Sequence, residues 1–172
     1  MEREVLKIFK NLEGDWLLFR EINDVLKDKL EYAEGRATFR SGDDNLDMDE
    51  RILDYEEFGI LKLSKPEKSL KFKRNYVYKY QNEEIEIYLD DGPTKGKLFQ
   101  KLLKRSNGEE YSFKGTEHIC RLDKHNGNYY FKNDREFETY YTIEGKNKRI
   151  EIKTLYKKIK AAPNRVDERQ TK

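Results

Sequence analysis

Polar and apolar residues alternate along most of the chain, and two stretches show this most clearly. Between Phe72 and Tyr80, aromatic side chains and Arg74 fall on one side of an extended strand, and lysines and asparagine fall on the other. Residues 150–157 alternate in the same way. A period of two is typical of strands with one wet and one covered face. Because the covered face mixes rings with arginine, it indicates a lined cavity rather than a dry core.

Turn-forming residues separate the extended stretches. The expected strands cover residues 15–22, 33–39, 46–57, 70–80, 84–90, 96–105, 110–123, 128–132, 136–144 and 148–159. The facing of 46–57 changes between Met48 and Leu53, as a β-bulge would cause. We interpret Gly59 and Lys65-Pro66-Glu67 as the connection that follows, and His125-Asn126-Gly127 as a turn.

About ten strands joined by short links predict antiparallel, up-and-down order, because such links are too short for parallel crossovers. An open sheet of that size would leave two unpaired edges, and closure removes them. Residues 3–12 place Val5, Phe9 and Leu12 at helical spacing. The expected fold is therefore an all-β barrel of about 8–10 strands with a short N-terminal helix. It would form a single domain over 1–160, with a flexible tail over 161–172.

Composition fits thin sheets with one apolar face. Only 35% of the 172 residues are hydrophobic and 41% are charged, while 12 Tyr and 9 Phe supply the rings. The 36 basic and 34 acidic residues nearly cancel, which indicates a solvated surface and gives no support to a nucleic-acid partner. Tyrosines interleaved with lysines also occur in platforms that bind single strands, but the charge balance favours ordinary strand composition.

The single cysteine, Cys120, excludes an intrachain disulfide and favours a reducing compartment. No run of 18 apolar residues is present, so no membrane span is expected. The first residues are charged and do not resemble a secretory signal. A soluble, cytoplasmic protein is the expectation.

Gly14-Asp15-Trp16 follows the expected helix and opens the first strand. This triplet resembles the glycine-x-tryptophan signature of lipocalins and the wider calycin group. The resemblance implies a lipocalin-like barrel in which Trp16 plugs one end and Lys158, from the last strand, packs over its ring.

Further motifs resemble a small lipocalin-like family of unknown function. They are Phe9-x-x-Leu12-x-Gly14-x-Trp16-x-Leu18-x-Arg20-x-Ile22, Gly35-x-Ala37-x-Phe39, Leu53-x-Tyr55-x-Glu57-x-Gly59, Arg74-x-Tyr76, Asp91-Gly92, His118-x-Cys120-x-x-Asp123 and Thr154-x-Tyr156. The family pattern has an arginine and a histidine where this chain has Pro93 and Gln100. Likewise, Lys158 replaces an arginine, and Tyr78 and Tyr141 replace tryptophans. The resemblance implies a fold and a cavity, and no reaction.

Two arginines are expected on the inner face, where a charge is costly unless it is paired. In one interpretation, Arg20 and Arg74 bind the anionic group of a ligand and tyrosine hydroxyls orient it. In the other, Arg20 or Arg74 forms an internal ion pair with Glu57. The candidate ligand-binding residues are Arg20, Glu57, Arg74, Tyr76, His118, Tyr141 and Tyr156, and the candidate cavity wall is Trp16, Phe39, Phe72 and Phe99.

His118 and Cys120 face the same way on an expected strand. With His125, they fall short of the about four ligands that a closed zinc site needs, so neither a metal nor a cofactor is expected. A likeness to haem-carrying calycins implies haem binding through His118 as an alternative. On a strand, His118 lies about 6–7 Å from Cys120, too far for it to act as the base of a nucleophile. Asp90-Asp91-Gly92-Pro93 is interpreted as a hairpin turn.

The favoured function is non-catalytic: the barrel binds a small apolar or aromatic ligand with an acidic group. An isomerase or lyase acting on a bound molecule is a second hypothesis, with His118 and Glu57 moving protons. A third is a protein-interaction module with a filled barrel. The cavity volume separates the third hypothesis from the first two.

Overall fold

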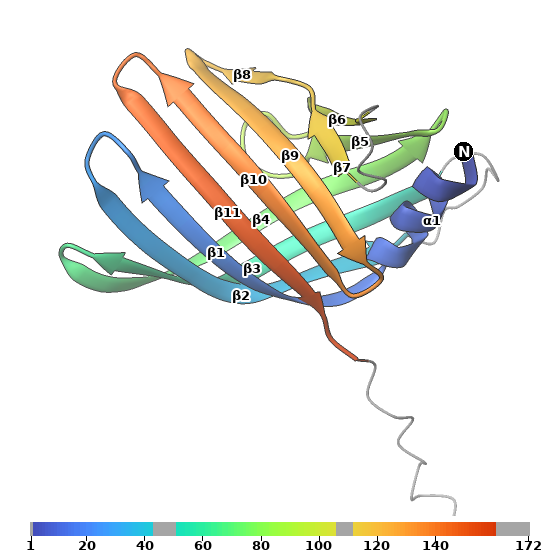
Figure 1. Ribbon diagram of the computed structural model, residues 1–172, viewed down its shortest axis with the longest axis horizontal. Coiled ribbons are helices and arrows are strands. Elements are labelled where there is room, and N and C mark those ends of the chain that lie inside the picture. Colours follow the sequence, from blue (N-terminus) through green and yellow to red (C-terminus); the bar gives the residue numbers. More distant parts are fainter. Residues whose placement is uncertain (1, 43–50, 106–111, 161–172) are drawn as a thin grey trace, which may run out of the picture.

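The computed structural model describes residues 2–42, 51–105 and 112–160, so the expected tail and the expected bulge near Met48 lie outside the described residues. One helix, α1 (Glu2–Leu12), precedes eleven strands (Figure 1). The strands are β1 (Gly14–Asp24), β2 (Lys29–Ser41), β3 (Arg51–Ser64), β4 (Glu67–Gln81), β5 (Glu84–Leu89), β6 (Leu98–Lys104), β7 (Ser112–Gly115), β8 (His118–Cys120), β9 (Asp123–Asn133), β10 (Glu136–Gly145) and β11 (Lys148–Lys158).

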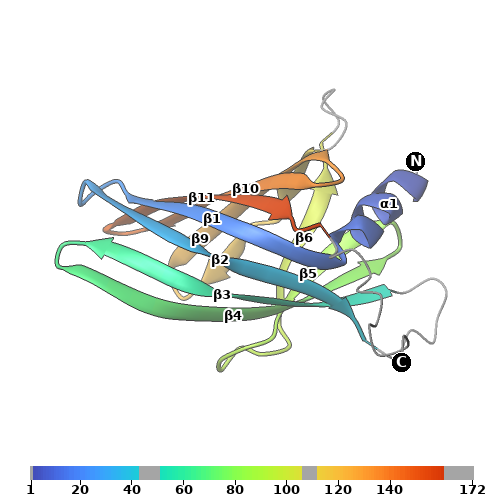
Figure 2. The same ribbon diagram turned by 90° about the horizontal axis from the view of Figure 1, so that it is seen from below.

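All pairings between strands are antiparallel, and the sheet closes on itself because β1 pairs with β11. Ten strands complete the ring. The short β8 and β7 occupy the same place in the ring beside β9. Strand β7 pairs with the second half of β9, and β8 pairs with its first residues. Figure 2 shows the curved sheet from below, with α1 at one end of the barrel. The structure confirms the expected up-and-down barrel with an N-terminal helix. Within the described residues, no helix is long and apolar enough to span a bilayer.

Helix α1 packs at one end of the barrel. Its buried residues Val5, Phe9 and Leu12 recur at helical spacing and join the core. The indole Nε1 of Trp16 donates a hydrogen bond to the carbonyl oxygen of Leu12 over 2.8 Å, which ties the helix to the start of β1. Lys158 Nζ lies 5.4 Å from the centre of the Trp16 ring, as the resemblance implied. This end of the barrel is therefore filled.

Two glycines on neighbouring strands allow β2 and β3 to approach closely. Gly59 was expected in a connection, but it lies inside β3 opposite Gly35 of β2. A Cβ on Gly59 would lie only 2.1 Å from the carbonyl oxygen of Glu34, so glycine is needed here for close packing of two backbones. The expected end of the strand at residue 57 is therefore wrong, and the connection falls at Lys65-Pro66.

The segment expected as one strand over 110–123 is divided. Within the described residues it forms β7 and β8, and the chain reverses at Arg121–Leu122, where Arg121 has a φ of 59°. The expected turn at His125-Asn126-Gly127 is wrong, because these residues lie inside β9. Gly127 has a packing role: a Cβ there would lie 2.5 Å from Cε1 of Tyr141. The correction places His125 on a strand instead of in a turn.

The close approach of β2 and β3 predicts that Gly59→Ala lowers the free energy of unfolding by about 2 kcal/mol or more, because a backbone must move to admit the methyl group. Urea denaturation measures this value. Gly42→Ala is the matched control, since a Cβ there meets only Asp54 Oδ2 at 4.0 Å, and it should change stability by less than about 0.5 kcal/mol. Equal effects of the two substitutions would contradict the packing argument.

Candidate functional site

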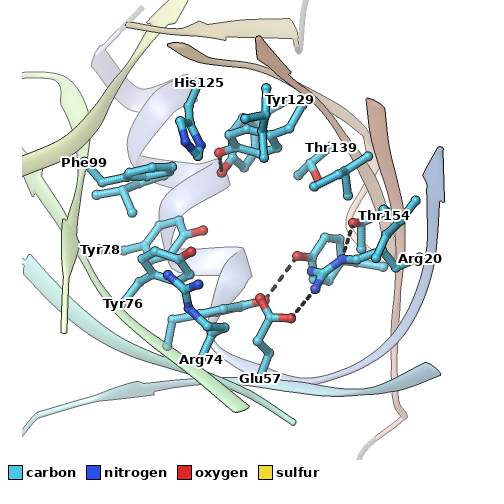
Figure 3. Close-up of a pocket in the computed structure, with 17 residues that line it drawn as sticks. Arg20, Glu57, Arg74, Tyr76, Tyr78, Phe99, His125, Tyr129, Thr139 and Thr154 are labelled. Atoms are coloured by element: carbon cyan, nitrogen blue, oxygen red, sulfur yellow. Dashed lines mark hydrogen bonds and ion pairs between the residues drawn. The ribbon is translucent and has the colours of Figure 1, made fainter. Parts of the chain in front are cut away.

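A cavity of about 260 Å³ lies inside the barrel, away from the filled end. On β1, the lining residues Arg20 and Ile22 follow Trp16, so the cavity occupies the half of the barrel remote from α1. Figure 3 looks into it, with α1 behind. The lining residues are Arg20, Ile22, Tyr55, Glu57, Arg74, Tyr76, Tyr78, Ile87, Phe99, His125, Tyr129, Thr139, Tyr141, Ile143, Ile152, Thr154 and Tyr156.

Arg20 of β1 and Glu57 of β3 form an ion pair in the cavity wall. Arg20 Nη1 lies 2.7 Å from Glu57 Oε2, and Arg20 Nε donates to Thr154 Oγ1 over 2.9 Å. The pair spans the intervening strand β2, whose inward residues Ala33 and Ala37 are small enough to leave room for it. Burial is the largest single effect and disfavours the charged guanidinium, but the Glu57 carboxylate together with Tyr156 and Tyr55 raises the pKa of Arg20 above its ordinary value. Of the two expected arginines, Arg20 is therefore the one with an internal partner.

Arg74 lies directly opposite Glu57 in the β3–β4 pairing, but its charge is directed elsewhere. Its Nε lies 3.3 Å from Asp91 Oδ2, and half of its side chain is exposed. Its guanidinium carbon lies 5.5 Å from the centre of the Tyr76 ring. The backbone N–H of Asn75 donates to the same Asp91 oxygen. Arg74 thus places an accessible positive charge at the rim of the cavity.

Six tyrosines line the cavity, and three of them, Tyr76, Tyr141 and Tyr156, were expected there. The hydroxyls of Tyr55 and Tyr156 are 3.1 Å apart, and Tyr141 donates to Gln100 Oε1 over 2.7 Å. Burial raises the pKa of Tyr156 to about 12 and also raises the pKa of Tyr76 and Tyr141. These hydroxyls therefore stay neutral at physiological pH and offer both donors and acceptors.

Phe99 reaches the cavity because of a bulge. The β5–β6 register shifts where Ile87 faces Gln100 and Tyr88 faces Leu98, which leaves Phe99 as the extra residue. Its ring lies 5.7 Å from Tyr76 and 6.2 Å from Tyr141, between ring centres. Phe99 is thus the member of the expected wall that lines the cavity.

The other expected wall residues lie outside the lining. Trp16 and Phe39 are about 1% exposed in the filled end near α1, and Phe72 packs beside Arg20, whose guanidinium carbon is 5.8 Å from its ring centre. All three side chains face inward, but they lie at a different position along the barrel axis from the cavity. Alternation predicts that a side chain faces inward. It does not predict the position along the barrel axis, because that position depends on strand tilt and register.

His118 is not among the lining residues either. It lies on β8 with its ring 4.8 Å from that of Phe99, whereas His125 on β9 does line the cavity. The short, interrupted β7 and β8 displace His118 from the barrel interior. The structure therefore gives no support to haem ligation by His118 inside the barrel, and it does not join His118 with Glu57. Among the described residues, no group of three or more His, Cys, Asp or Glu side chains is placed to hold a metal ion.

Several lining residues were missed in the sequence. Tyr55 and Tyr78 belong to clearly alternating strands. Thr139 and Ile143 share one face of residues 136–144 with Tyr141, so the alternation that would have identified all four residues was present. His125 was hidden by its assignment to a turn. The missed lining residues are Ile22, Tyr55, Tyr78, Ile87, His125, Tyr129, Thr139, Ile143 and Ile152.

Comparison with known proteins extends this description. Residues 12–158 match the model of a family described as a family of unknown function, DUF6314. No curated protein matches the chain. The match and the fold together confirm the expected resemblance to an uncharacterised lipocalin-like family.

The solved structures with a similar fold include the following two. The S-type phycobiliprotein lyase CPES from Guillardia theta is 11% identical with a TM-score of 0.69, and the alignment covers 92% of this chain and 94% of that chain. A Nostoc punctiforme protein of unknown function from the DUF3598 family is 6% identical with a TM-score of 0.56. That alignment covers 87% of this chain but only 48% of that chain. At these identities the likeness shows the fold alone.

The internal ion pair predicts a large effect of Glu57→Gln. The substitution leaves the Arg20 charge in the wall without its carboxylate, which should lower the free energy of unfolding by about 3 kcal/mol. Replacing both partners by apolar residues, as in Arg20→Met with Glu57→Leu, should recover most of this loss. Urea denaturation of the three variants provides the comparison. A double variant less stable than Glu57→Gln would contradict the assigned pairing.

The buried tyrosines predict a loss of stability at high pH. Tyr156 keeps its proton to about pH 12 in the folded state, whereas an exposed tyrosine loses it near pH 10. Above about pH 10 the unfolded chain therefore binds fewer protons than the folded chain, and the free energy of unfolding falls as pH rises to 12. Absorbance at 295 nm with pH titration should show a late ionisation that coincides with unfolding. Full ionisation of all tyrosines near pH 10 in the folded protein would contradict this.

Proposed function

This chain belongs to DUF6314, a family of unknown function, and we propose from the geometry of its own cavity that it binds a small aromatic or apolar molecule carrying one acidic group. The observation that carries the proposal is a cavity whose wall is made of rings and isoleucines, with neutral hydroxyls inside and a cation at the rim.

Cavity volume sets the size of the ligand. A single buried water needs about 10–15 Å³ of cavity, so 260 Å³ holds more than a few waters. It is below the roughly 300–1,000 Å³ of pockets for drug-sized ligands. The volume favours a molecule of one or two rings and disfavours an interaction module with a filled barrel.

The charges indicate how the ligand would lie. Arg20 already has a carboxylate partner, so an anion at that depth would compete with Glu57. The side chain of Arg74 is half-exposed at the rim, and its ion-pair partner among the described residues is Asp91. We therefore orient the acidic group of the ligand toward Arg74 and its apolar part toward Phe99 and Ile152. Tyr76, Tyr141 and Tyr156 would offer hydroxyls to polar atoms of the inserted part.

The similar fold of the phycobiliprotein lyase is consistent with a small molecule held in a barrel of this kind. A lyase or isomerase activity of this chain would need a proton-transfer group in contact with the ligand. The pair considered for that role, His118 with Glu57, is not assembled, because His118 lies outside the lining and Glu57 is held by Arg20. That pair therefore gives no support to catalysis, and we propose binding alone.

Fluorescence titration with 1-naphthoate tests the proposal, since this probe has two fused rings and one carboxylate. Saturable binding is expected, and Arg74→Gln should weaken it about fivefold or more, because an ionic hydrogen bond contributes about 1.5 kcal/mol or more before screening at the exposed rim. Neutral 1-naphthamide is the matched probe, and its affinity should not change in this variant.

Two further variants locate the probe. Ile152→Trp fills the cavity and should abolish binding of both probes, whereas Ile60→Trp on the exposed outer face should not. Native mass spectrometry of the protein purified from cells would identify any retained molecule. Equal affinities of the Ile152→Trp and unsubstituted proteins would contradict binding inside the barrel.

A further inference from the structure

The two histidines of the chain face each other across an antiparallel strand pair at the rim of the cavity. His118 of β8 is the direct partner of His125 of β9. Their ring centres are 5.9 Å apart with an interplanar angle of 77°. The sequence has no other histidine. Direct cross-strand partners have Cβ atoms about 4.5–5.5 Å apart, so both rings can reach one point between them.

We propose that His118 and His125 together bind a divalent transition metal ion of the zinc or copper class. Imidazole nitrogens bind such ions at about 2.0–2.1 Å, so two rings that share one ion have centres roughly 5–6 Å apart. The observed 5.9 Å separation lies in that range. The donor set also fits, because imidazole suits zinc, copper and nickel better than the hard cations magnesium and calcium.

The surroundings prepare the rings for this role. The ring of His118 packs against that of Phe99 with 4.8 Å between ring centres, which fixes its orientation beside His125. Burial lowers the pKa of His118, and burial with the neighbouring His118 lowers the pKa of His125. The lowered pKa values favour the neutral imidazole, which is the form that binds metals.

Neighbouring charges do not oppose a cation strongly. Arg74 and Lys148 lie within electrostatic reach of His125, but each has its own carboxylate. Arg74 pairs with Asp91, and Lys148 Nζ lies 3.1 Å from Asp123 Oδ2. Asp123 itself favours a positive charge at His125. The local balance is therefore close to neutral.

Two protein ligands leave coordination positions open, to be filled by water or by a carboxylate. Because His125 lines the cavity, an ion held here would stand at its entrance. Zinc sites usually have three or four protein ligands, so the affinity expected from two imidazoles is modest, and the ion would be exchangeable. The inference concerns the metal alone and does not depend on the proposed organic ligand.

Isothermal titration of the tag-free full chain with Zn²⁺ at pH 7.5 tests the proposal. One ion per chain is expected. His118→Ala and His125→Ala should each weaken binding at least tenfold. The double variant should show only the nonspecific Zn²⁺ binding of the rest of the chain. His118→Gln and His125→Gln serve as conservative variants if alanine lowers the thermal midpoint. Cys120→Ser is the matched control, because that thiol is exposed and lies two residues from His118, and its affinity should be unchanged.

Electron paramagnetic resonance with Cu²⁺ counts the ligands independently. Hyperfine structure from two imidazole nitrogens is expected in the unsubstituted protein and from one in each single variant. The proposal is overturned if Zn²⁺ binds no more tightly than to the double variant, if only one histidine affects binding, or if Cys120→Ser removes it.

Discussion

Pairing of the first strand with the last is the constraint on which the rest of the structure depends. The β1–β11 ladder runs from Trp16 opposite Lys158 to Asp24 opposite Ile150 and joins segments more than 100 residues apart. Once this ladder forms, the sheet has no continuous open edge, and every alternate side chain is directed into a common interior. Without it, Arg20 and Thr154 would not be neighbours, and Arg20 would lose the hydrogen bond to Thr154 that accompanies its ion pair with Glu57.

The barrel interior has two halves that differ along the barrel axis. Near α1 it is filled by Trp16, Phe39 and other large apolar side chains, which supply the burial that stabilises the fold. Farther along, the wall is incompletely packed, and an ion pair and tyrosines stand among isoleucines. Buried polar groups of this kind contribute less stability than apolar packing. Their presence around a cavity of about 260 Å³ is the physical reason to assign binding to this half.

Much of the fold follows from the sequence, because period-two alternation and turn residues report local geometry directly. The helix, the barrel and the inward facing of Arg20, Tyr76 and Tyr141 were predictable in this way. Two glycines misled the prediction: Gly59 and Gly127 lie in strands, where they admit a neighbouring backbone and a tyrosine ring. Such contacts join residues far apart in the chain and leave no local signal. The height of Trp16, Phe39 and Phe72 in the barrel, and the facing of His118 and His125, depend on register in the same way.

Occupancy of the lumen is the central claim, and methyl-resolved NMR of isoleucine-labelled protein tests it most directly. Ile22, Ile87, Ile143 and Ile152 line the cavity, Ile8 lines a separate groove beside α1, and Ile60 and Ile119 are exposed outside. Titration with 1-naphthoate should shift the methyl signals of the first group and leave those of the other three residues in place. Shifts confined to Ile8, Ile60 or Ile119 would show that the molecule binds outside the barrel and would contradict the account.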